Sequence, residues 1–138
     1  MKIAVSACLL GENCKYNGGN NYSKKLVEFL KDKEVITLCP EVLGGLPIPR
    51  KPAEIVGGVV KLENGRSVDY EFKKGAQIAL DKVINNQVDL VILQSRIPSC
   101  GINYIYDGSF RGKLIKGHGV FAQILIDNHI RVIDIEDL

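Results

Sequence analysis

Three nearly continuous apolar runs, separated by amphipathic segments, limit the possible folds of this chain more than any other feature. The runs are KIAVSACLL at residues 2–10, EVITL at 34–38 and DLVIL at 89–93. Runs of this kind are typical of parallel strands that are buried on both faces of a sheet. The sequence therefore predicts three core strands of a parallel sheet.

The segments between the runs have the periodicity of helices. Residues 23–33 place their apolar side chains on one helical face, and Ser23 is a candidate N-cap. Residues 70–85 likewise gather apolar side chains on one face. The other expected elements are a loop at 43–52, a strand at 59–62, a helix at 117–128 and a strand at 130–135.

This order of strands and helices predicts an α/β fold, a three-layer sandwich around a mostly parallel sheet of the Rossmann-like type. The chain has 138 residues, which is an ordinary size for one domain, so we expect a single domain over residues 1–138. In such folds, ligands bind beyond the carboxyl ends of the strands. Residues that directly follow the predicted strands are therefore candidates for a functional site.

Charge and apolar content exclude some functional classes. The formal net charge is +2, which is too small to indicate binding to a nucleic acid polymer. No stretch reaches the roughly 18 apolar residues of a membrane-spanning helix, and the apolar N-terminal run is followed at once by Gly11, Glu12 and Asn13. We therefore expect a cytoplasmic protein without a membrane partner, in which cysteines are thiols or metal ligands rather than disulfides.

The four cysteines fall close to the ends of the predicted strands. Cys8 lies near the end of the first strand, Cys39 directly follows the second, and Cys100 lies in the loop after the third. Cys14 lies in the loop after the first strand. Thiolates are soft ligands suited to iron–sulfur clusters, zinc or copper(I), but the sequence contains no CxxC pair. The spacing leaves a metal site, a catalytic thiol and buried thiols open.

Two polar residues beside these cysteines could supply acid–base chemistry. Glu41 follows Cys39 by two positions, and Ser99 directly precedes Cys100. A carboxylate and a hydroxyl next to one metal site form an acid–base set. Glu41 and Ser99 are therefore the candidate catalytic residues, although a solvated loop carboxylate and a turn-capping serine are the structural alternatives.

Three further residues are candidates for substrate binding. Arg50 offers a planar guanidinium to a carboxylate, phosphate or carbonyl oxygen, or alternatively pairs with Glu54. Gly101 helps to shape a loop that leaves space for a substrate. Asp107 either faces the same site or forms an ordinary turn with Gly108.

Four segments, in the same order along the chain, resemble those of a known family. They are VSACLLGENCKYNG (5–18), CPEVLGGLPIPRKPAEI (39–55), PSCG with IYDGSFRG (98–112) and GHGVFAQIL (117–125). Together they resemble the thiouracil desulfurase-like family, small bacterial proteins formerly described only as a domain of unknown function. Ile97 stands where the family often has serine, and Lys15 and Asn17 stand where Arg and Asp are common, which alters the expected polar lining of the pocket.

The resemblance implies a non-redox iron–sulfur enzyme. It implies a 4Fe–4S cluster that is held by Cys8, Cys39 and Cys100 and has one iron without a protein ligand. Such an iron would be an open Lewis-acid site for the sulfur of a small thiolated substrate, either a thiolated nucleobase or a related heteroaromatic thione. Water would replace the sulfur, hydrogen sulfide would be released, and Glu41 and Ser99 would transfer protons and position water or substrate.

The residues leave two other functions open. The cluster, or a zinc or copper(I) ion, could make the protein a carrier or sensor of metal or sulfide without turnover, in which case loss of Glu41 would change little. A hydrolase with Cys100 as its nucleophile would need a histidine partner, and neither His118 nor His129 has the sequence context of one. The role of Cys14 is also open, because it could replace Cys8 as a ligand.

Overall fold

A four-stranded parallel sheet organises the computed structural model, which describes all residues from 1 to 138. The strand order is β2-β1-β5-β8, and each neighbouring pair is parallel. The strands are β1 (Lys2–Ser6), β2 (Glu34–Leu38), β5 (Leu90–Leu93) and β8 (Val132–Asp134). The three predicted core strands therefore lie side by side, and the mostly parallel sheet is confirmed.

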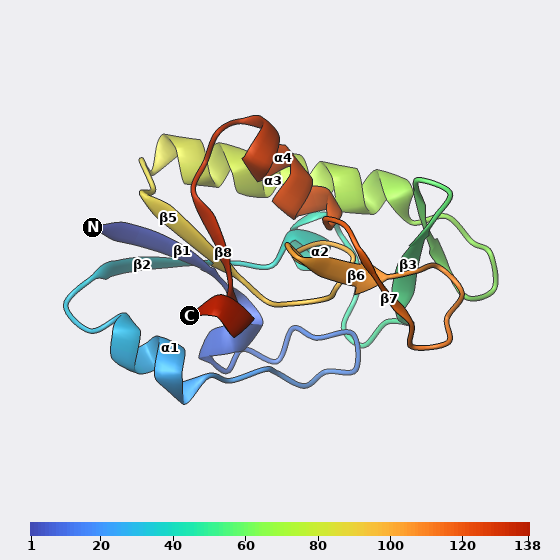
Figure 1. Cartoon of the computed structure of the whole chain (residues 1–138), viewed down its shortest axis with the longest axis horizontal. Helices are drawn as coiled ribbons and strands as arrows, with labels where there is room; N and C mark the ends of the chain where they lie inside the picture. The colour runs from blue at the N-terminus through green and yellow to red at the C-terminus, as the bar shows by residue number, and fades with distance from the viewer.

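Helices cover both faces of this sheet (Figure 1). The helices α3 (Asp69–Asn85) and α4 (Val120–Asp127) lie on one face, and α1 (Lys24–Phe29) lies on the other. The resulting order of layers is α/β/α, which confirms the predicted three-layer sandwich. Ser23 caps α1 as expected, because its hydroxyl oxygen accepts a hydrogen bond from the Leu26 amide at 3.2 Å.

Two apolar cores separate the layers. Val91 and Leu93 of β5 belong to the core beneath α3 and α4, whereas Ile92 belongs to the core beneath α1. Successive side chains of a strand point to opposite faces, so the apolar run of β5 fills both cores. This explains why the predicted strands are continuous apolar runs rather than alternating ones.

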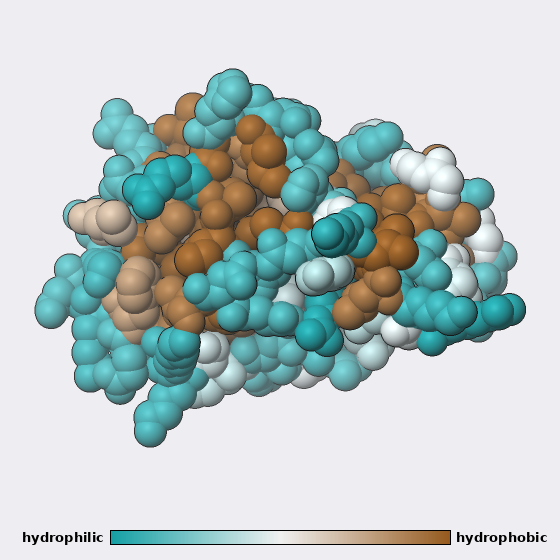
Figure 2. Space-filling model, viewed as in Figure 1, coloured by the Kyte–Doolittle hydropathy of each residue, from teal (hydrophilic) through white to brown (hydrophobic).

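Two small hairpins extend from the carboxyl-end side of the sheet (Figure 1). One consists of β3 (Ala53–Val56) and β4 (Val59–Leu62), and the other of β6 (Tyr104–Tyr106) and β7 (Leu114–Lys116). Only β4 is expected from the sequence. Figure 2 shows apolar side chains on the β6–β7 hairpin among otherwise hydrophilic ones, and Leu114 and Ile115 are exposed there.

The first strand ends earlier than its apolar run predicts. β1 stops at Ser6, and Ala7–Leu10 forms a 3-10 helix, η1, which ends at Gly11. Gly11 has a φ of 95°, a left-handed conformation that glycine adopts without the steric cost of a side chain. The expected strand over 2–10 is therefore wrong in its second half, and Cys8 lies in a turn beyond the sheet.

None of the helices combines the length and the apolar content that a membrane span requires.

Candidate functional site

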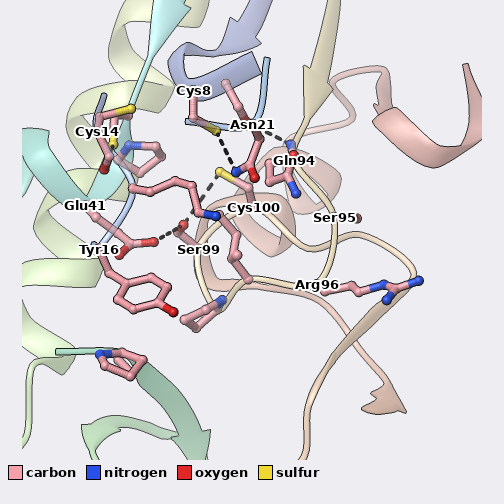
Figure 3. A pocket seen from close by; sticks show the side chains of 18 of the residues that line it. Cys8, Cys14, Tyr16, Asn21, Glu41, Gln94, Ser95, Arg96, Ser99 and Cys100 are labelled. Carbon is pink, nitrogen blue, oxygen red and sulfur yellow. Dashed lines mark hydrogen bonds between the residues drawn. The ribbon is translucent and has the colours of Figure 1, made fainter. Parts of the chain in front are cut away.

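A cavity of about 660 Å³ opens beyond the carboxyl ends of β1, β2 and β5. It is lined by all four cysteines together with Glu41 and Ser99. Figure 3 shows Cys8, Cys14 and Cys100 beside Glu41 and Ser99. This is the edge at which ligands bind in parallel α/β sheets. The structure therefore brings together every predicted metal ligand and both predicted catalytic residues.

Three of the four thiols, those of Cys8, Cys14 and Cys39, influence one another's pKa. The Cys8 sulfur accepts a hydrogen bond from Asn21 Nδ2 at 3.5 Å, and the Cys39 thiol faces the Cys14 carbonyl oxygen at 4.0 Å. The neighbouring Cys14 thiol lowers the pKa of the Cys8 thiol and lowers that of Cys39 to about 7. The neighbouring sulfurs of Cys39 and Cys8 raise the pKa of Cys14, because they favour its protonated form. Cys8 and Cys39 are therefore the more easily ionised thiols.

Cys100 is more deeply buried than the other three cysteines. It is 2% exposed, and burial raises the pKa of its thiol, although hydrogen bonds to Ser6 and Ser99 oppose this effect. Ser99 Oγ lies 3.6 Å from Cys100 Sγ. Because its pKa is raised, the Cys100 thiol is protonated at neutral pH. A bound metal would displace this proton, since only the deprotonated sulfur is a ligand.

The arrangement of the thiols suits a cluster better than a single ion. No three His, Cys, Asp or Glu side chains converge closely enough to share one metal ion. Cys39, Cys8 and Cys100 instead follow β2, β1 and β5, which are neighbours in the sheet, and adjacent strands are about 4.8 Å apart. In a 4Fe–4S cluster each cysteine ligand binds a different iron, so ligands spread along a sheet edge fit such a group.

Glu41 and Ser99 form the central polar contact of the cavity. Ser99 Oγ donates a hydrogen bond to Glu41 Oε2 at 2.7 Å, although the two residues are 58 positions apart in sequence. Ser99 is buried and Glu41 has a side chain that is only 13% exposed. The alternatives of a solvated loop carboxylate and a simple turn cap therefore do not describe this pair.

A short helix that was not predicted positions Glu41. Pro40 begins α2 (Pro40–Leu43) directly after Cys39, and Glu41 lies in its first turn. A proline suits the first helical position, since no intrahelical partner exists for an amide there. Helix α2 packs closely on α3, because a methyl group at Gly75 would lie 1.7 Å from the Pro40 carbonyl oxygen. The glycine thus allows the backbone that carries Cys39 and Glu41 to approach α3.

The loop that carries Ser99 and Cys100 is fastened to the beginning of α4. The amides of Val120 and Phe121 donate to the carbonyl oxygens of Pro98 at 2.8 Å and Ser99 at 2.9 Å. The first amides of a helix have no partner within the helix, and here the loop carbonyls supply one. Gly101 does not line the cavity, and a side chain there would meet the Tyr104 carbonyl oxygen at 2.7 Å. Its role in the structure is close packing.

Arg50 contacts Glu41 rather than Glu54. Its Nε donates to Glu41 Oε1 at 3.1 Å, so the expected alternative of an Arg50–Glu54 pair is wrong. Glu54 instead accepts hydrogen bonds from the amides of Gly108 at 3.0 Å and Phe110 at 3.1 Å. The buried Glu54 carboxylate thereby fixes the loop between β6 and β7 beside the cavity.

Asp107 lies outside the cavity lining. Its carboxylate accepts hydrogen bonds from the amide and hydroxyl of Ser109, at 2.9 and 2.5 Å, and these bonds hold its pKa below the usual range. The turn interpretation therefore describes Asp107 in this structure. Neither histidine lines the cavity, so Cys100 has no imidazole base and the hydrolase hypothesis loses its support.

Sequence reasoning missed several residues of the cavity wall. They come from the loop after η1, the loop after β5 and the β6–β7 hairpin, and they share no spacing. Only the aromatic residues within the motifs KYNG and IYDGSF could have drawn attention to part of them. The missed lining residues include aromatic Tyr16, Tyr106 and Phe110, amides Asn21 and Gln94, and the cation Arg96, whereas Lys15 lines the cavity as its motif suggested.

Comparisons with known proteins agree with this site. A family model described as 2-thiouracil desulfurase matches residues 3–137. The uncharacterized protein YbbK of Bacillus subtilis (strain 168) is 38% identical over 146 aligned positions, which cover 99% of this chain and 97% of that protein. A solved structure described as the 4Fe-4S-dependent thiouracil desulfidase TudS (DUF523Vcz) has a TM-score of 0.93 and 38% identity, and the match covers 99% of this chain and 92% of that chain.

Proposed function

The chain belongs to the 2-thiouracil desulfurase family, and we propose that it is an iron–sulfur-dependent enzyme that removes sulfur from a small thiolated heteroaromatic compound. In the net reaction, a thiocarbonyl and water give a carbonyl and hydrogen sulfide. The atoms balance without an oxidant or reductant, so the reaction is non-redox. The contact between Ser99 Oγ and Glu41 Oε2 at 2.7 Å, in a cavity lined by four cysteines, is the observation that carries this proposal.

We assign Cys8, Cys39 and Cys100 as the ligands of a 4Fe–4S cluster. They follow three neighbouring strands, β1, β2 and β5, whereas Cys14 comes from the loop between η1 and α1. When bound through three cysteines, the cluster supplies an open iron that acts as a Lewis acid toward the substrate sulfur. Cys14 is left as a neighbouring thiol that can donate a hydrogen bond to a ligand sulfur.

Glu41 is the proton acceptor of the proposed reaction. One of its carboxylate oxygens, Oε2, faces the Ser99 hydroxyl within the cavity. Glu41 takes one proton from the attacking water and gives it to the departing sulfur. The second water proton leaves the new hydroxyl group as the carbonyl forms and also passes to the sulfur, which is released as hydrogen sulfide. Ser99 orients the carboxylate and the water, because a hydroxyl both donates and accepts hydrogen bonds.

The remaining cavity wall suits a flat, polar ring. The volume of about 660 Å³ is in the range of small-molecule sites. Tyr16, Tyr106 and Phe110 can stack on an aromatic ring, and the amide side chains of Asn21 and Gln94 can pair with ring carbonyl and N–H groups. A thiolated nucleobase has these features, so 2-thiouracil is the substrate to test first.

The experiment is anaerobic reconstitution followed by a turnover assay. Iron and acid-labile sulfide are measured per chain, and release of hydrogen sulfide and uracil from 2-thiouracil is followed for the wild type, Glu41→Gln and the surface variant Glu28→Gln. We expect the Glu41 variant to keep the cluster and to lose about 100-fold or more in kcat, the usual contribution of a general base. Equal activity of the two variants would exclude Glu41 as the base. A cluster-loaded wild type without turnover on any thiolated ring would favour the carrier or sensor hypothesis.

A further inference from the structure

Arg50 directs its guanidinium toward three parts of the protein at once. Nε donates to Glu41 Oε1 at 3.1 Å, Nη1 to the Pro47 carbonyl oxygen at 3.1 Å, and Nη2 to the Cys14 carbonyl oxygen at 2.9 Å. Three of the five N–H donors of the side chain are therefore taken up by the protein. Each of them reaches a different segment of the chain.

The side chain is also unusually enclosed for an arginine. Arg50 has a side chain that is 8% exposed, compared with 13% for its partner Glu41. An ion pair at this depth is screened far less than a surface pair. Removing the cation would leave the carboxylate with an unbalanced charge in a place where charge is costly.

Main-chain contacts extend the same connection. The Arg50 amide donates to the Tyr16 carbonyl oxygen at 2.6 Å, so one residue holds the segment from Cys14 to Tyr16 through both its backbone and its side chain. That segment carries a thiol and an aromatic ring of the cavity. Arg50 thus joins this loop to the Glu41 carboxylate.

The two oxygens of Glu41 have different partners. Oε1 accepts from Arg50 and Oε2 accepts from Ser99, and together these bonds fix the position and the plane of the carboxylate. Precise placement of a base matters for rate, because a displacement of about 1 Å can cost roughly 100-fold.

From these contacts we propose that Arg50 is a positioning residue, which holds the Glu41 carboxylate and ties the Cys14–Tyr16 loop to it, and is not the substrate-binding residue that the sequence suggests. The inference rests on the proposed desulfurase function. In this role Arg50 contributes to kcat, because it positions Glu41, and does not contribute to the affinity for the substrate.

A second cavity makes this assignment testable by chemical rescue. It has a volume of about 340 Å³ and shares Glu41 and Arg50 with the first cavity, so the ion pair lies in the wall between the two. Truncation of Arg50 would open a space next to this second cavity. A guanidinium ion from solution could then occupy the position of the lost side chain beside Glu41.

The experiment compares Arg50→Ala and Arg50→Lys with the wild type and with Lys51→Ala. Lys51 is the exposed neighbour of Arg50, and it lines only the second cavity. Iron content, kcat, KM for 2-thiouracil and the effect of added guanidinium chloride are measured, with sodium chloride as the salt control. We expect near wild-type iron content, a kcat lowered about 100-fold, a KM within about twofold, and recovery of kcat with guanidinium in Arg50→Ala alone. Arg50→Lys keeps a charge without the planar fork and should recover only part of the rate.

Other results would overturn the inference. A raised KM with an unchanged kcat would make Arg50 a substrate contact, and loss of iron in both variants would assign it to cluster loading. Should the wild type bind a cluster but turn over no thiolated ring, the proposed function would fail while Arg50 could still be judged by crystallography. In that case a Glu41 side chain that keeps its contact with Ser99 in Arg50→Lys and Arg50→Ala would overturn the positioning role, and a rotated carboxylate would support it.

Discussion

Gly75 of α3 lies so close to Pro40 of α2 that a methyl group at Gly75 would be 1.7 Å from the Pro40 carbonyl oxygen. Because Cys39 and Glu41 flank Pro40, this contact between two backbones fixes the distance from α3 of a proposed cluster ligand, Cys39, and of the proposed base, Glu41. Real carbon–oxygen contacts are never this short, so any side chain at Gly75 must push α2 away from α3.

We therefore expect Gly75→Ala to destabilise the protein. In an unhindered helix, this change would stabilise by about 1 kcal/mol, whereas overpacking of a tight contact costs about 1–3 kcal/mol. Urea unfolding of this variant and of Gln77→Ala, an exposed site on the same helix, measures the difference. An unchanged or higher free energy of unfolding for Gly75→Ala would show that the two helices are not in backbone contact.

The ligand assignment makes a second prediction. Single changes of Cys8, Cys39 or Cys100 to serine should each abolish the cluster, because these three thiolates are the full protein ligand set in the proposed assignment and a hydroxyl is a much harder donor. Cys14→Ser should retain iron, since its hydroxyl can still donate a hydrogen bond to a neighbouring sulfur. Iron, acid-labile sulfide and the visible absorption of anaerobically reconstituted variants measure this. A Cys14 variant without iron, beside a Cys8 variant with it, would exchange the roles of these two residues.

Much of this site follows from the sequence because strand ends meet at one edge of a parallel sheet. The apolar runs located β1, β2 and β5, and their ends located Cys8, Cys39 and Cys100. The order of neighbouring strands could not be read from the runs themselves. It depends on the packing of helices over both faces, which no local pattern records.

The parts that could not be predicted depend on loops. Arg50 reaches Glu41 because the proline-rich segment folds back onto the Cys14 loop, and such a path has no periodicity. Strands of three residues, such as β6 and β7, are too short to show alternation. The hydrogen bonds of Glu54 depend on the position of that hairpin, so they could not be predicted from the sequence either.

Asp69 makes the stability of the β3–β4 region dependent on pH. Burial alone would raise the pKa of Asp69, but hydrogen bonds from Lys73 and the Val60 amide outweigh burial and hold the pKa below its usual range. A carboxyl with a lowered folded-state pKa stabilises the protein above its unfolded pKa of about 3.9 and loses that contribution as the pH falls through the folded value.

The wild type should therefore exceed Asp69→Asn in free energy of unfolding at pH 7, and the difference should shrink below about pH 4. Urea unfolding of both proteins between pH 7 and pH 3 measures this difference. Asp81→Asn, on the exposed face of α3, is the matched control and should show no such trend. A constant difference across this range would mean that the charge of Asp69 is not involved.

The Glu54 carboxylate makes a prediction about the wall of the cavity. Its Oε1 accepts from the amides of Gly108 and Phe110, so Glu54→Ala leaves both amides without this partner. The loss should cost about 1–3 kcal/mol, speed hydrogen exchange in residues 107–112 and raise the KM for 2-thiouracil. Glu54→Gln keeps one acceptor oxygen and should have a smaller effect on all three. Unchanged exchange in Glu54→Ala would show that the loop is held by other contacts.

Phe110 allows stability and function to be separated at one position. Its φ of 58° lies in the left-handed region, which is unfavourable for a bulky residue and favourable for glycine. Backbone strain of this kind costs about 1–3 kcal/mol and is found where a side chain is held for function, and Phe110 lines the proposed substrate cavity. The free energy of unfolding of Phe110→Gly should therefore be equal to or higher than that of Phe110→Ala, although glycine normally lowers stability relative to alanine.

Both Phe110 variants should nevertheless raise the KM for 2-thiouracil by about tenfold, the worth of one stacking contact on a base, while kcat and iron content stay near those of the wild type. Urea unfolding and steady-state kinetics on the same two proteins provide the measurements. A KM equal to that of the wild type in both variants would remove Phe110 from the substrate site. A stability order with Phe110→Ala above Phe110→Gly would instead show that the left-handed backbone relaxes once the ring is gone, because alanine would then have no strain to bear.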